Sequence, residues 1–328
     1  MRLLTLLVLA LLGTSACAAA LVPPPPEGVG IPVDLPLVSV GSVENPELRE
    51  LSGLVASRDH ADVLWAHGDS GSPPRLFALG ADLQTVVPDW LRARFGTGAG
   101  LVRPPWPGIE LAGATHVDWE DVARIGDRLY VADVGNNGNA RRDLGFWELP
   151  EPAPEAVDRA RPARFLPVHY PEQRAFPGEV WEWDCEAVFS DGDVLWLITK
   201  HRRADEITGF VPGARLYRFE PGRAGEASTP LELVARHDTL SVATAADLSP
   251  DGELLAVLTY SALWLFPRPE AGAHWLSGRP WIRRLPLLRT RQAEAVAWRD
   301  DRRLLVANED GAFFELDVDR EVLAAAAP

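Results

Sequence analysis

The chain has 328 residues, and its 47 Asp and Glu outnumber its 32 Lys and Arg, which gives a net charge of -15. A surplus of negative charge repels phosphate backbones and anionic lipid surfaces, so we expect no nucleic-acid partner. The seven His residues show no spacing typical of a zinc finger or a metalloprotease, which disfavours zinc. The hydrophobic fraction of 47% suffices for one large core or two ordinary ones, so periodicity has to decide the number of domains.

The N-terminus has the layout of a secretory signal. Arg2 precedes an apolar run over residues 3–12, and a series of small residues follows. The run is too short to span a bilayer. Cys17 follows two small residues, as in the lipobox of bacterial lipoproteins, although Thr14 stands where Leu is usual. We therefore expect a signal peptide over residues 1–20.

Export has consequences for the rest of the chain. We expect the protein in the periplasm, on a membrane through acyl chains at Cys17, or secreted after ordinary cleavage among the alanines. Cys185 is the only other cysteine, so no intramolecular disulfide is expected. Pro23 and the three prolines after it begin a stiff linker over residues 21–35, and the folded domain is expected over residues 36–328.

Five segments of the chain repeat the same order of residue types. Each begins with an apolar run and enters a polar turn, and a second apolar run, a third with an aromatic centre and a fainter fourth come next. The first runs lie at Glu50–Val55, Asp118–Ala123, Asp184–Phe189, Thr244–Ser249 and Gln292–Ala297. The fourth runs lie near Ile109–Ala114, Arg164–His169, Leu231–Arg236 and Trp281–Leu288.

This pattern predicts an all-β fold, a β-propeller with five blades of four antiparallel strands each. The fifth repeat runs out of chain after its third strand, whereas Leu37–Val40 stands without a partner before the first repeat. We expect this N-terminal strand to complete the last blade and close the ring, which removes two exposed sheet edges. A sixth blade within one of the long connections is the alternative.

The propeller topology gathers acidic residues at one end of the central channel, because the first strand of each blade starts there and the second finishes there. Carboxylates that converge in this way repel one another, and raised pKa values or a bound Ca²⁺ or Mg²⁺ would relieve the repulsion. Alternatively, each acid accepts hydrogen bonds from the backbone of neighbouring blades and has a structural role. No organic cofactor is expected. Asp247 is expected at the same end. The expected cation ligands are Glu50, Asp69, Asp118, Asp133, Asp184, Glu294 and Glu309.

Other side chains near this end are candidates for ligand binding. The basic ones stand beside carboxylates and would hold an anionic group or simply neutralise the acids. The aromatic ones adjoin the acidic positions, whereas the tryptophans inside predicted strands are expected to pack between blades. The candidates are Asp121, Lys200, Arg141, Arg142, Trp119 and Trp183.

Three motifs carry a resemblance to a known family: Glu50–Leu54, the block Asp118–Ala123 with Leu129–Asn137, and Gln292–Ala297. Over about residues 48–316 the chain resembles a group of secreted bacterial propellers that is similar to phytase-like propellers. More distantly it resembles gluconolactonase and strictosidine-synthase-like propellers. The chain departs from the pattern at Asn137, a place that is often acidic, and at Ala246 in the fourth repeat. The resemblance implies divalent cations at the channel mouth, held by Glu50, Asp69, Asp118, Glu120, Asp133, Glu186 and Glu294.

Two functions fit these features. The first is a non-catalytic, monomeric propeller of the cell envelope whose acidic mouth binds a divalent cation, a small polar or anionic ligand, or an envelope protein. The second is a metal-dependent hydrolase of phosphoesters or lactones, in which Glu120 or Glu186 would act as general base. A glycosidase that uses two of the carboxylates is a third, weaker hypothesis. The lack of a recognisable nucleophile in the sequence favours the first.

Overall fold

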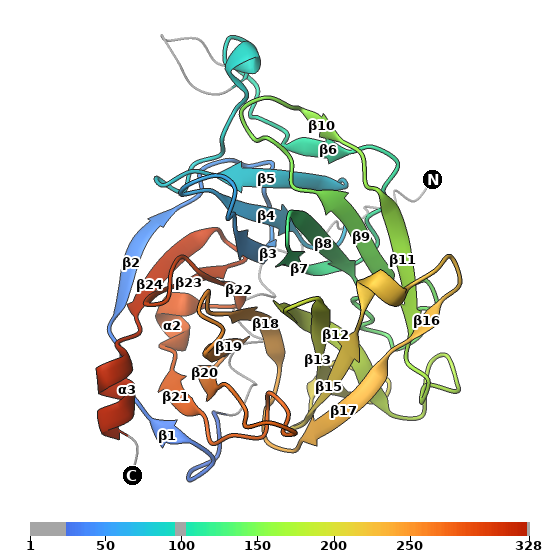
Figure 1. Ribbon diagram of the computed structural model, residues 1–328, viewed down its shortest axis with the longest axis vertical. Coiled ribbons are helices and arrows are strands. Elements are labelled where there is room, and N and C mark those ends of the chain that lie inside the picture. Colours follow the sequence, from blue (N-terminus) through green and yellow to red (C-terminus); the bar gives the residue numbers. More distant parts are fainter. Residues whose placement is uncertain (1–23, 96–102, 327–328) are drawn as a thin grey trace, which may run out of the picture.

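A computed structural model describes residues 24–95 and 103–326 of the chain. Its strands form five sheets, which are the blades of a propeller around a central channel (Figure 1). The innermost strand of each blade contacts the innermost strand of the next, so the five close a ring. The prediction of a five-bladed, all-β propeller is confirmed. The innermost strands are β3 (Leu51–Ala56), β7 (Trp119–Ile125), β12 (Trp181–Asp191), β18 (Ala243–Leu248) and β22 (Ala293–Trp298).

The blades are numbered here in chain order of these innermost strands, and each continues outward. Blade 1 adds β4 (Leu64–Gly68), β5 (Arg75–Leu79), β6 (Ile109–Leu111) and β10 (Arg159–Ala160). Blade 2 adds β8 (Arg128–Asp133), β9 (Gly145–Pro150), β11 (Arg164–His169) and β16 (Thr229–Pro230). Blade 3 adds β13 (Val194–Arg203), β15 (Ala214–Phe219) and β17 (Glu232–His237), with β14 (Glu206–Phe210) paired to β13. Blade 4 adds β19 (Leu254–Thr259), β20 (Ala262–Pro267), β21 (Trp281–Arg284) and β1 (Ile31–Pro32).

Blade 5 is completed by an N-terminal strand, as expected. Its outer strands are β23 (Arg303–Asn308), β24 (Ala312–Asp317) and β2 (Leu37–Ser42). β2 pairs antiparallel with β24 and places Leu37 opposite Leu316, so the two ends of the described chain share one sheet. The helices are short: η2 (Asp89–Leu91), η3 (Pro221–Arg223), α2 (Leu287–Thr290) and α3 (Arg320–Ala326).

The proline-rich segment joins the folded unit before residue 36. β1 pairs in parallel with β21, and Leu35 is buried in the apolar cluster between blades 4 and 5. The expected signal peptide and Cys17 lie outside the described residues. Within residues 24–95 and 103–326, no helix has the length and apolar content needed to cross a bilayer. Cys185 is buried and free in the same part of the chain.

Five large hydrophobic clusters lie one between each pair of neighbouring blades, and a small sixth cluster of the described residues joins Val242 and Tyr260 with Phe210. The middle strands are therefore covered on both faces, which explains why they read as continuous apolar runs. Trp65 and Trp264 are fully buried in two of these clusters, and Trp147 and Trp196 pack against them, as expected. At about 25 cal/mol per Å², an indole that buries roughly 150–250 Å² contributes about 4–6 kcal/mol before the cost of ordering.

Tight hairpins mark the end of the channel opposite the acidic residues. Gly126 and Gly192 have φ angles of 58° and 59°, in the left-handed region that favours glycine. They make the two-residue loops between β7 and β8 and between β12 and β13. This end holds a cavity of about 250 Å³ lined by residues that include Arg58, Ser190 and Asp247. The start of each innermost strand lies at the other end, called the channel mouth below.

Candidate metal centre at the channel mouth

Every blade has a β-bulge in its innermost strand, close to the channel mouth. The pairing with the second strand shifts by an extra residue at the same place in all five blades. A bulge leaves the extra residue outside the ladder and redirects its side chain. The bulged residues are Ser52 with Gly53, then Glu120, Glu186, Thr244 and Glu294. Three of the five blades therefore present a glutamate from the same structural position.

The fourth repeat is aligned differently from our expectation. Its bulge is at Thr244, so Thr244 and not Ala246 corresponds to Glu120. Asp247 consequently lies at the opposite end of the channel, where its Oδ2 accepts a 2.7 Å hydrogen bond from the Trp298 N–H. The expectation that Asp247 belongs to the mouth is wrong. A shift of two residues leaves the same side chains on the same face of the strand, so the sequence pattern did not reveal the true alignment of the fourth repeat.

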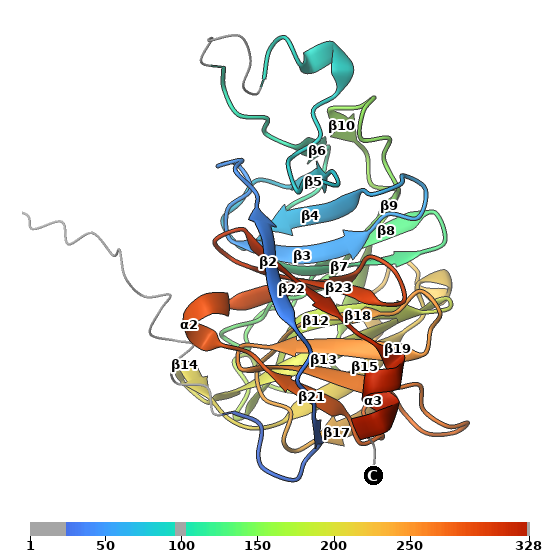
Figure 2. The same cartoon turned by 90° about the vertical axis from the view of Figure 1, so that its left-hand side faces the viewer.

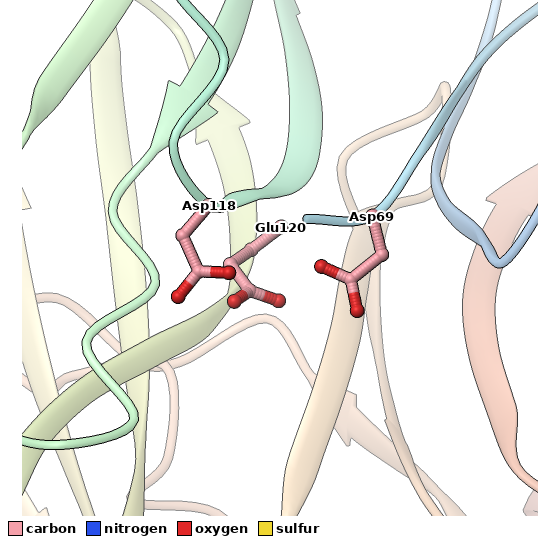
Figure 3. Close-up of side chains that lie close together, drawn as sticks. All are labelled: Asp69, Asp118 and Glu120. Atoms are coloured by element: carbon pink, nitrogen blue, oxygen red, sulfur yellow. The ribbon is translucent and has the colours of Figure 1, made fainter. Parts of the chain in front are cut away.

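Three carboxylates from two blades meet at the mouth (Figure 3). Asp69 follows β4, Asp118 immediately precedes β7, and Glu120 is the bulged residue of β7. One carboxylate oxygen of each lies within 4.8 Å of the others. We call these residues the open trio. Among residues 24–95 and 103–326, the Glu120 side chain has neither a hydrogen-bond nor an ion-pair partner, although it is only 5% exposed.

Burial and mutual repulsion raise the proton affinity of the open trio. Burial, followed by the charges of Asp69 and Asp184, raises the pKa of Asp118 to about 7. The pKa of Glu120 is raised well above its usual value by burial and by the surrounding carboxylates, Glu186 first. Burial also raises the pKa of Asp69. Deprotonation of the trio is therefore more costly than that of exposed carboxylates unless a cation takes the place of the protons.

The backbone of the loop after β8 packs closely against these carboxylates. A Cβ atom added at Gly135 would lie 2.1 Å from Glu120 Oε1 and 2.5 Å from Asp118 Oδ2. Only glycine leaves room there. The neighbouring Asn137 donates a 3.2 Å hydrogen bond from Nδ2 to Asp118 Oδ2. This loop thus forms one wall of the open trio.

A second group of carboxylates adjoins the first and shares Glu120. Oxygens of Glu120, Asp184 and Glu186 also lie within 4.8 Å of one another. We call Asp184 and Glu186 the paired acids, because both have cationic partners. Arg202 Nε lies 2.8 Å from Asp184 Oδ2, and its Nη2 lies 3.2 Å from Glu186 Oε1. Lys200 Nζ also contacts Glu186 directly.

These ion pairs outweigh burial at Asp184 but not at Glu186, whose pKa burial raises to about 8. Burial alone would raise the pKa of Asp184, but Arg202 and Lys200 hold it below its usual value. Burial would likewise lower the pKa of Lys200, and the Glu186 carboxylate outweighs this and raises it. The mouth is therefore divided into an uncompensated half and a compensated half.

The remaining predicted cation ligands lie around these two groups. Glu294 accepts a 2.8 Å hydrogen bond from the Tyr260 hydroxyl, and burial raises its pKa to about 7. Glu309 accepts one of 3.2 Å from Gln292 Nε2. The Glu50 side chain is exposed, and its backbone carbonyl accepts a 2.8 Å hydrogen bond from the Asp69 N–H. Glu50 thus positions the open trio through its backbone.

Asp133 and Arg141 form a buried ion pair behind Asp118. Arg141 Nη2 lies 2.8 Å from Asp133 Oδ1, and Asp133 is 1% exposed. The same carboxylate oxygen accepts a 3.1 Å hydrogen bond from the Asp118 N–H, and Arg141 Nη1 donates to the Gly135 carbonyl at 2.8 Å. This pair therefore fixes the backbone on both sides of the open trio.

Two other ligand-binding candidates, Asp121 and Arg142, lie away from the trio. Asp121 is fully buried, and its Oδ2 accepts hydrogen bonds from the N–H groups of Val188 at 2.8 Å and Ala246 at 3.3 Å. It ties blade 2 to blades 3 and 4 across the channel. Arg142 is exposed, with its guanidinium 4.4 Å from the ring centre of Phe176.

The two candidate tryptophans are packed in the clusters between blades. Trp119 is fully buried between blades 1 and 2, where it stacks on His116 at 4.3 Å and donates a 3.0 Å hydrogen bond to the Thr115 carbonyl. Trp183 is 6% exposed between blades 2 and 3, and the Arg215 guanidinium lies 5.1 Å from its ring. These contacts account for both side chains as packing residues.

The sequence did not indicate a role for Gly135 or Phe210, nor that the Asn137 side chain would link two other side chains of the site. Asn137 lies in a run of Gly and Asn after a predicted strand, a signal for a loop with special backbone angles, and its side chain reaches both Asp118 and Arg202. Phe210 lies 5.4 Å from Lys200 Nζ, measured to its ring centre. Nothing in the local sequence places it there.

No protein-family model matches the chain, and no curated protein matches it. Solved structures with a similar fold include a gluconolactonase from Xanthomonas campestris, 13% identical, with a TM-score of 0.39 over 92% of this chain and 86% of that one. Another is the PQQ-bound aldose sugar dehydrogenase from Streptomyces coelicolor, 11% identical, with a TM-score of 0.45 over 90% of this chain and 100% of that one. Both neighbours are β-propellers, and the likeness concerns the fold alone. The resemblance to phytase-like propellers stays a prediction.

Proposed function

We propose that the protein is an exported β-propeller that binds a divalent cation at the channel mouth through Asp69, Asp118 and Glu120. The observation that carries this proposal is the Glu120 carboxylate, which is 95% buried, directed at two further carboxylates and without a partner among the described residues. A buried ionised carboxylate costs several kcal/mol unless it is paired or bound to a metal. A cation in the open trio would remove this cost for all three acids.

The donor set favours Ca²⁺. All three side chains offer carboxylate oxygen atoms, which hard cations prefer. Ca²⁺ accepts irregular coordination by oxygen ligands at about 2.3–2.6 Å, whereas Mg²⁺ demands near-ideal octahedral geometry at about 2.0–2.1 Å. No histidine of residues 24–95 and 103–326 belongs to either group of side chains that could hold an ion.

The place of the protein in the cell is part of the same proposal. The described chain begins beside the mouth end of blade 4, where Pro24 and Pro26 line a groove with Pro212, Ser241 and Thr259. Pro24 is seven positions after Cys17, with six residues between them. An extended chain of that length spans about 25 Å at most. Acylation at Cys17 would thus hold the mouth near the bilayer surface, within reach of small polar or anionic ligands in the envelope.

Calorimetric titration of the EDTA-treated chain with CaCl2 tests the proposal. We expect wild-type protein to bind Ca²⁺ and to gain about 2.7 kcal/mol of stability at a free concentration one hundred times Kd. Glu120→Gln should abolish binding and leave the cation-free protein at least as stable, because a buried charge is removed. Glu253→Gln, which changes an exposed acid in the turn between β18 and β19 at the opposite end of the channel, is the control and should bind normally. Wild-type protein that neither binds Ca²⁺ or Mg²⁺ nor gains stability at millimolar concentrations would contradict the proposal.

One observation favours a metal-dependent hydrolase as the second candidate. Asp118 has a pKa of about 7, which suits a general base at neutral pH. The cation, held in this case by Asp69 and Glu120, would supply charge stabilisation for a phosphoester or lactone substrate, and Asp118 would accept the proton. Glu186 is less suited to this role because Lys200 and Arg202 pair with it. Turnover of p-nitrophenyl phosphate or a sugar lactone that needs Ca²⁺ and is lost in Asp118→Asn would establish the hydrolase.

A further inference from the structure

We infer that Lys200 occupies the place of a second cation, so that the channel mouth holds one divalent ion and not two. The inference deepens the proposed function and rests on the open trio as the site of that single ion. It follows from three features of blade 3: the position of Lys200, the strand extension that covers it, and the distribution of charge around it.

The position of Lys200 is one that two other blades fill with an acid. In each blade, one residue of the second strand pairs with the residue just before the bulge, and the position meant here is the next one along the second strand. It holds Asp69 in blade 1 and Glu309 in blade 5, Val134 in blade 2 and Tyr260 in blade 4, and Lys200 in blade 3. Replacing an acid by a base at one position of a ring changes the local charge by two units. The ammonium group therefore stands where a bound cation would otherwise be needed.

An extension of blade 3 encloses this ammonium group. β13 has ten residues, against five or six in the second strands of the other blades, and it continues past the mouth into β14. Figure 2 shows β14 projecting from the same side of the ring as α2, which leads into β22. Phe210 at the end of β14 packs edge-on against Tyr260 of blade 4. Lys200 Nζ lies 5.4 Å from the Phe210 ring centre and 5.8 Å from that of Tyr260, and the side chain is 3% exposed.

The charges of the paired acids are matched by side chains of the same blade. Glu186 contacts both Lys200 and Arg202, and Asp184 contacts Arg202 and accepts the Asn136 N–H at 2.8 Å. The open trio lies on the other side of Glu120 and receives no such contact from a basic side chain of the described residues. Without Lys200, oxygens of Glu120, Asp184 and Glu186 would form a second acidic trio adjacent to the first. Two ions bridged by one carboxylate, about 3.5–4 Å apart, are a common arrangement in proteins.

The number of Ca²⁺ ions bound per chain tests this inference, measured by equilibrium dialysis with metal analysis. We expect one ion for wild-type protein and two for Lys200→Met, whose unbranched apolar side chain can keep the packing between Phe210 and Tyr260. Arg203→Met removes an exposed cation from the same strand and should leave the number at one. The double variant Lys200→Met with Glu186→Gln should return to one. A wild-type value of two, or a folded Lys200→Met variant that binds one, would overturn the inference.

Two further outcomes separate this inference from the proposed function. Wild-type protein that binds no ion, together with Lys200→Met that binds one, would refute the open trio as a site and still support the role of Lys200. If Lys200→Met is unfolded without metal, Ca²⁺ should restore folding, as followed by near-ultraviolet circular dichroism, because the ion replaces the ammonium charge. Lys200→Gln, which keeps a hydrogen-bond donor toward Glu186, should behave in the same way. Failure of millimolar Ca²⁺ to rescue either variant would count against the inference.

Discussion

The Ser52 hydroxyl donates a 2.6 Å hydrogen bond to the backbone carbonyl of Glu120, which joins the bulge of blade 1 to the bulge of blade 2. The Thr244 hydroxyl makes the corresponding bond of 2.8 Å to the Ala293 carbonyl, between blades 4 and 5. At two of the five junctions between blades, the bulge regions are thus connected by a side-chain hydrogen bond as well as by packing. One of these two bonds supports the open trio directly, and the other does not.

Removal of the Ser52 hydroxyl should weaken both the fold and cation binding. We expect Ser52→Ala to lower the free energy of unfolding by about 0.5–1.5 kcal/mol and to lower Ca²⁺ affinity as well, because the Glu120 backbone loses its anchor. Thr244→Ala should lose similar stability with unchanged affinity. Urea unfolding and calorimetric titration measure the two quantities. Equal effects of the two variants on affinity would contradict the role given to Ser52.

Gly135→Ala should displace the carboxylates of the open trio and so weaken cation binding. Its Cβ would lie 2.1 Å from a Glu120 oxygen, so the carboxylates must move apart or rotate away. We expect at least about a tenfold loss of Ca²⁺ affinity, which corresponds to about 1.4 kcal/mol. Gly138→Ala lies in the same loop with no atom within 4 Å of the added Cβ, and it should bind as wild type does.

Stability without metal should fall as the pH rises from about 5 to about 8. The pKa of Asp118 is raised to about 7 in the folded state, so folding is favoured while the group holds its proton and loses this contribution as the pH passes that value. Saturating Ca²⁺ should reverse the trend, because the ion binds the deprotonated carboxylates and its affinity increases with pH. Thermal unfolding at several pH values with EDTA or CaCl2 measures both trends. Asp118→Asn should flatten the curve obtained with EDTA.

Removing only one partner of the Asp133–Arg141 ion pair should lower the free energy of unfolding considerably. Arg141→Met leaves the buried Asp133 carboxylate without its cation, and we expect a loss of about 3–5 kcal/mol in the free energy of unfolding. The double variant Asp133→Asn with Arg141→Met should lose less, since no charge stays buried alone. Arg142→Ala, next in the chain and exposed, should change stability by less than about 1 kcal/mol. Urea unfolding of the four proteins, wild type included, forms the comparison.

Several features of this protein follow from the sequence alone. Short-range signals such as Ile125-Gly126-Asp127 between apolar runs specify hairpins, and their repetition predicted the blades. The unpaired run Leu37–Val40 predicted that the first strand completes the last blade, which pairing with β24 confirms. Chain direction then placed Asp69, Asp118 and Glu120 at one end of the channel. These inferences succeed because strand alternation and turn chemistry depend on neighbours in the chain.

The tertiary structure decided the register of the fourth repeat and the charge balance of the mouth. Thr244 and Ala246 are two positions apart, so an alignment with either one at the bulge gives the same alternation of side chains. Only the pairing of β18 with β19 shows that the bulge is at Thr244. Pairing of β12 with β13 sets Lys200 and Arg202 against Asp184 and Glu186, whereas packing of blade 1 against blade 2 brings Asp69 beside Asp118 and Glu120. No basic side chain of the described residues makes an ion pair with these last three acids. Such distances between blades are set by how five sheets pack around one axis. No local stretch of sequence contains them.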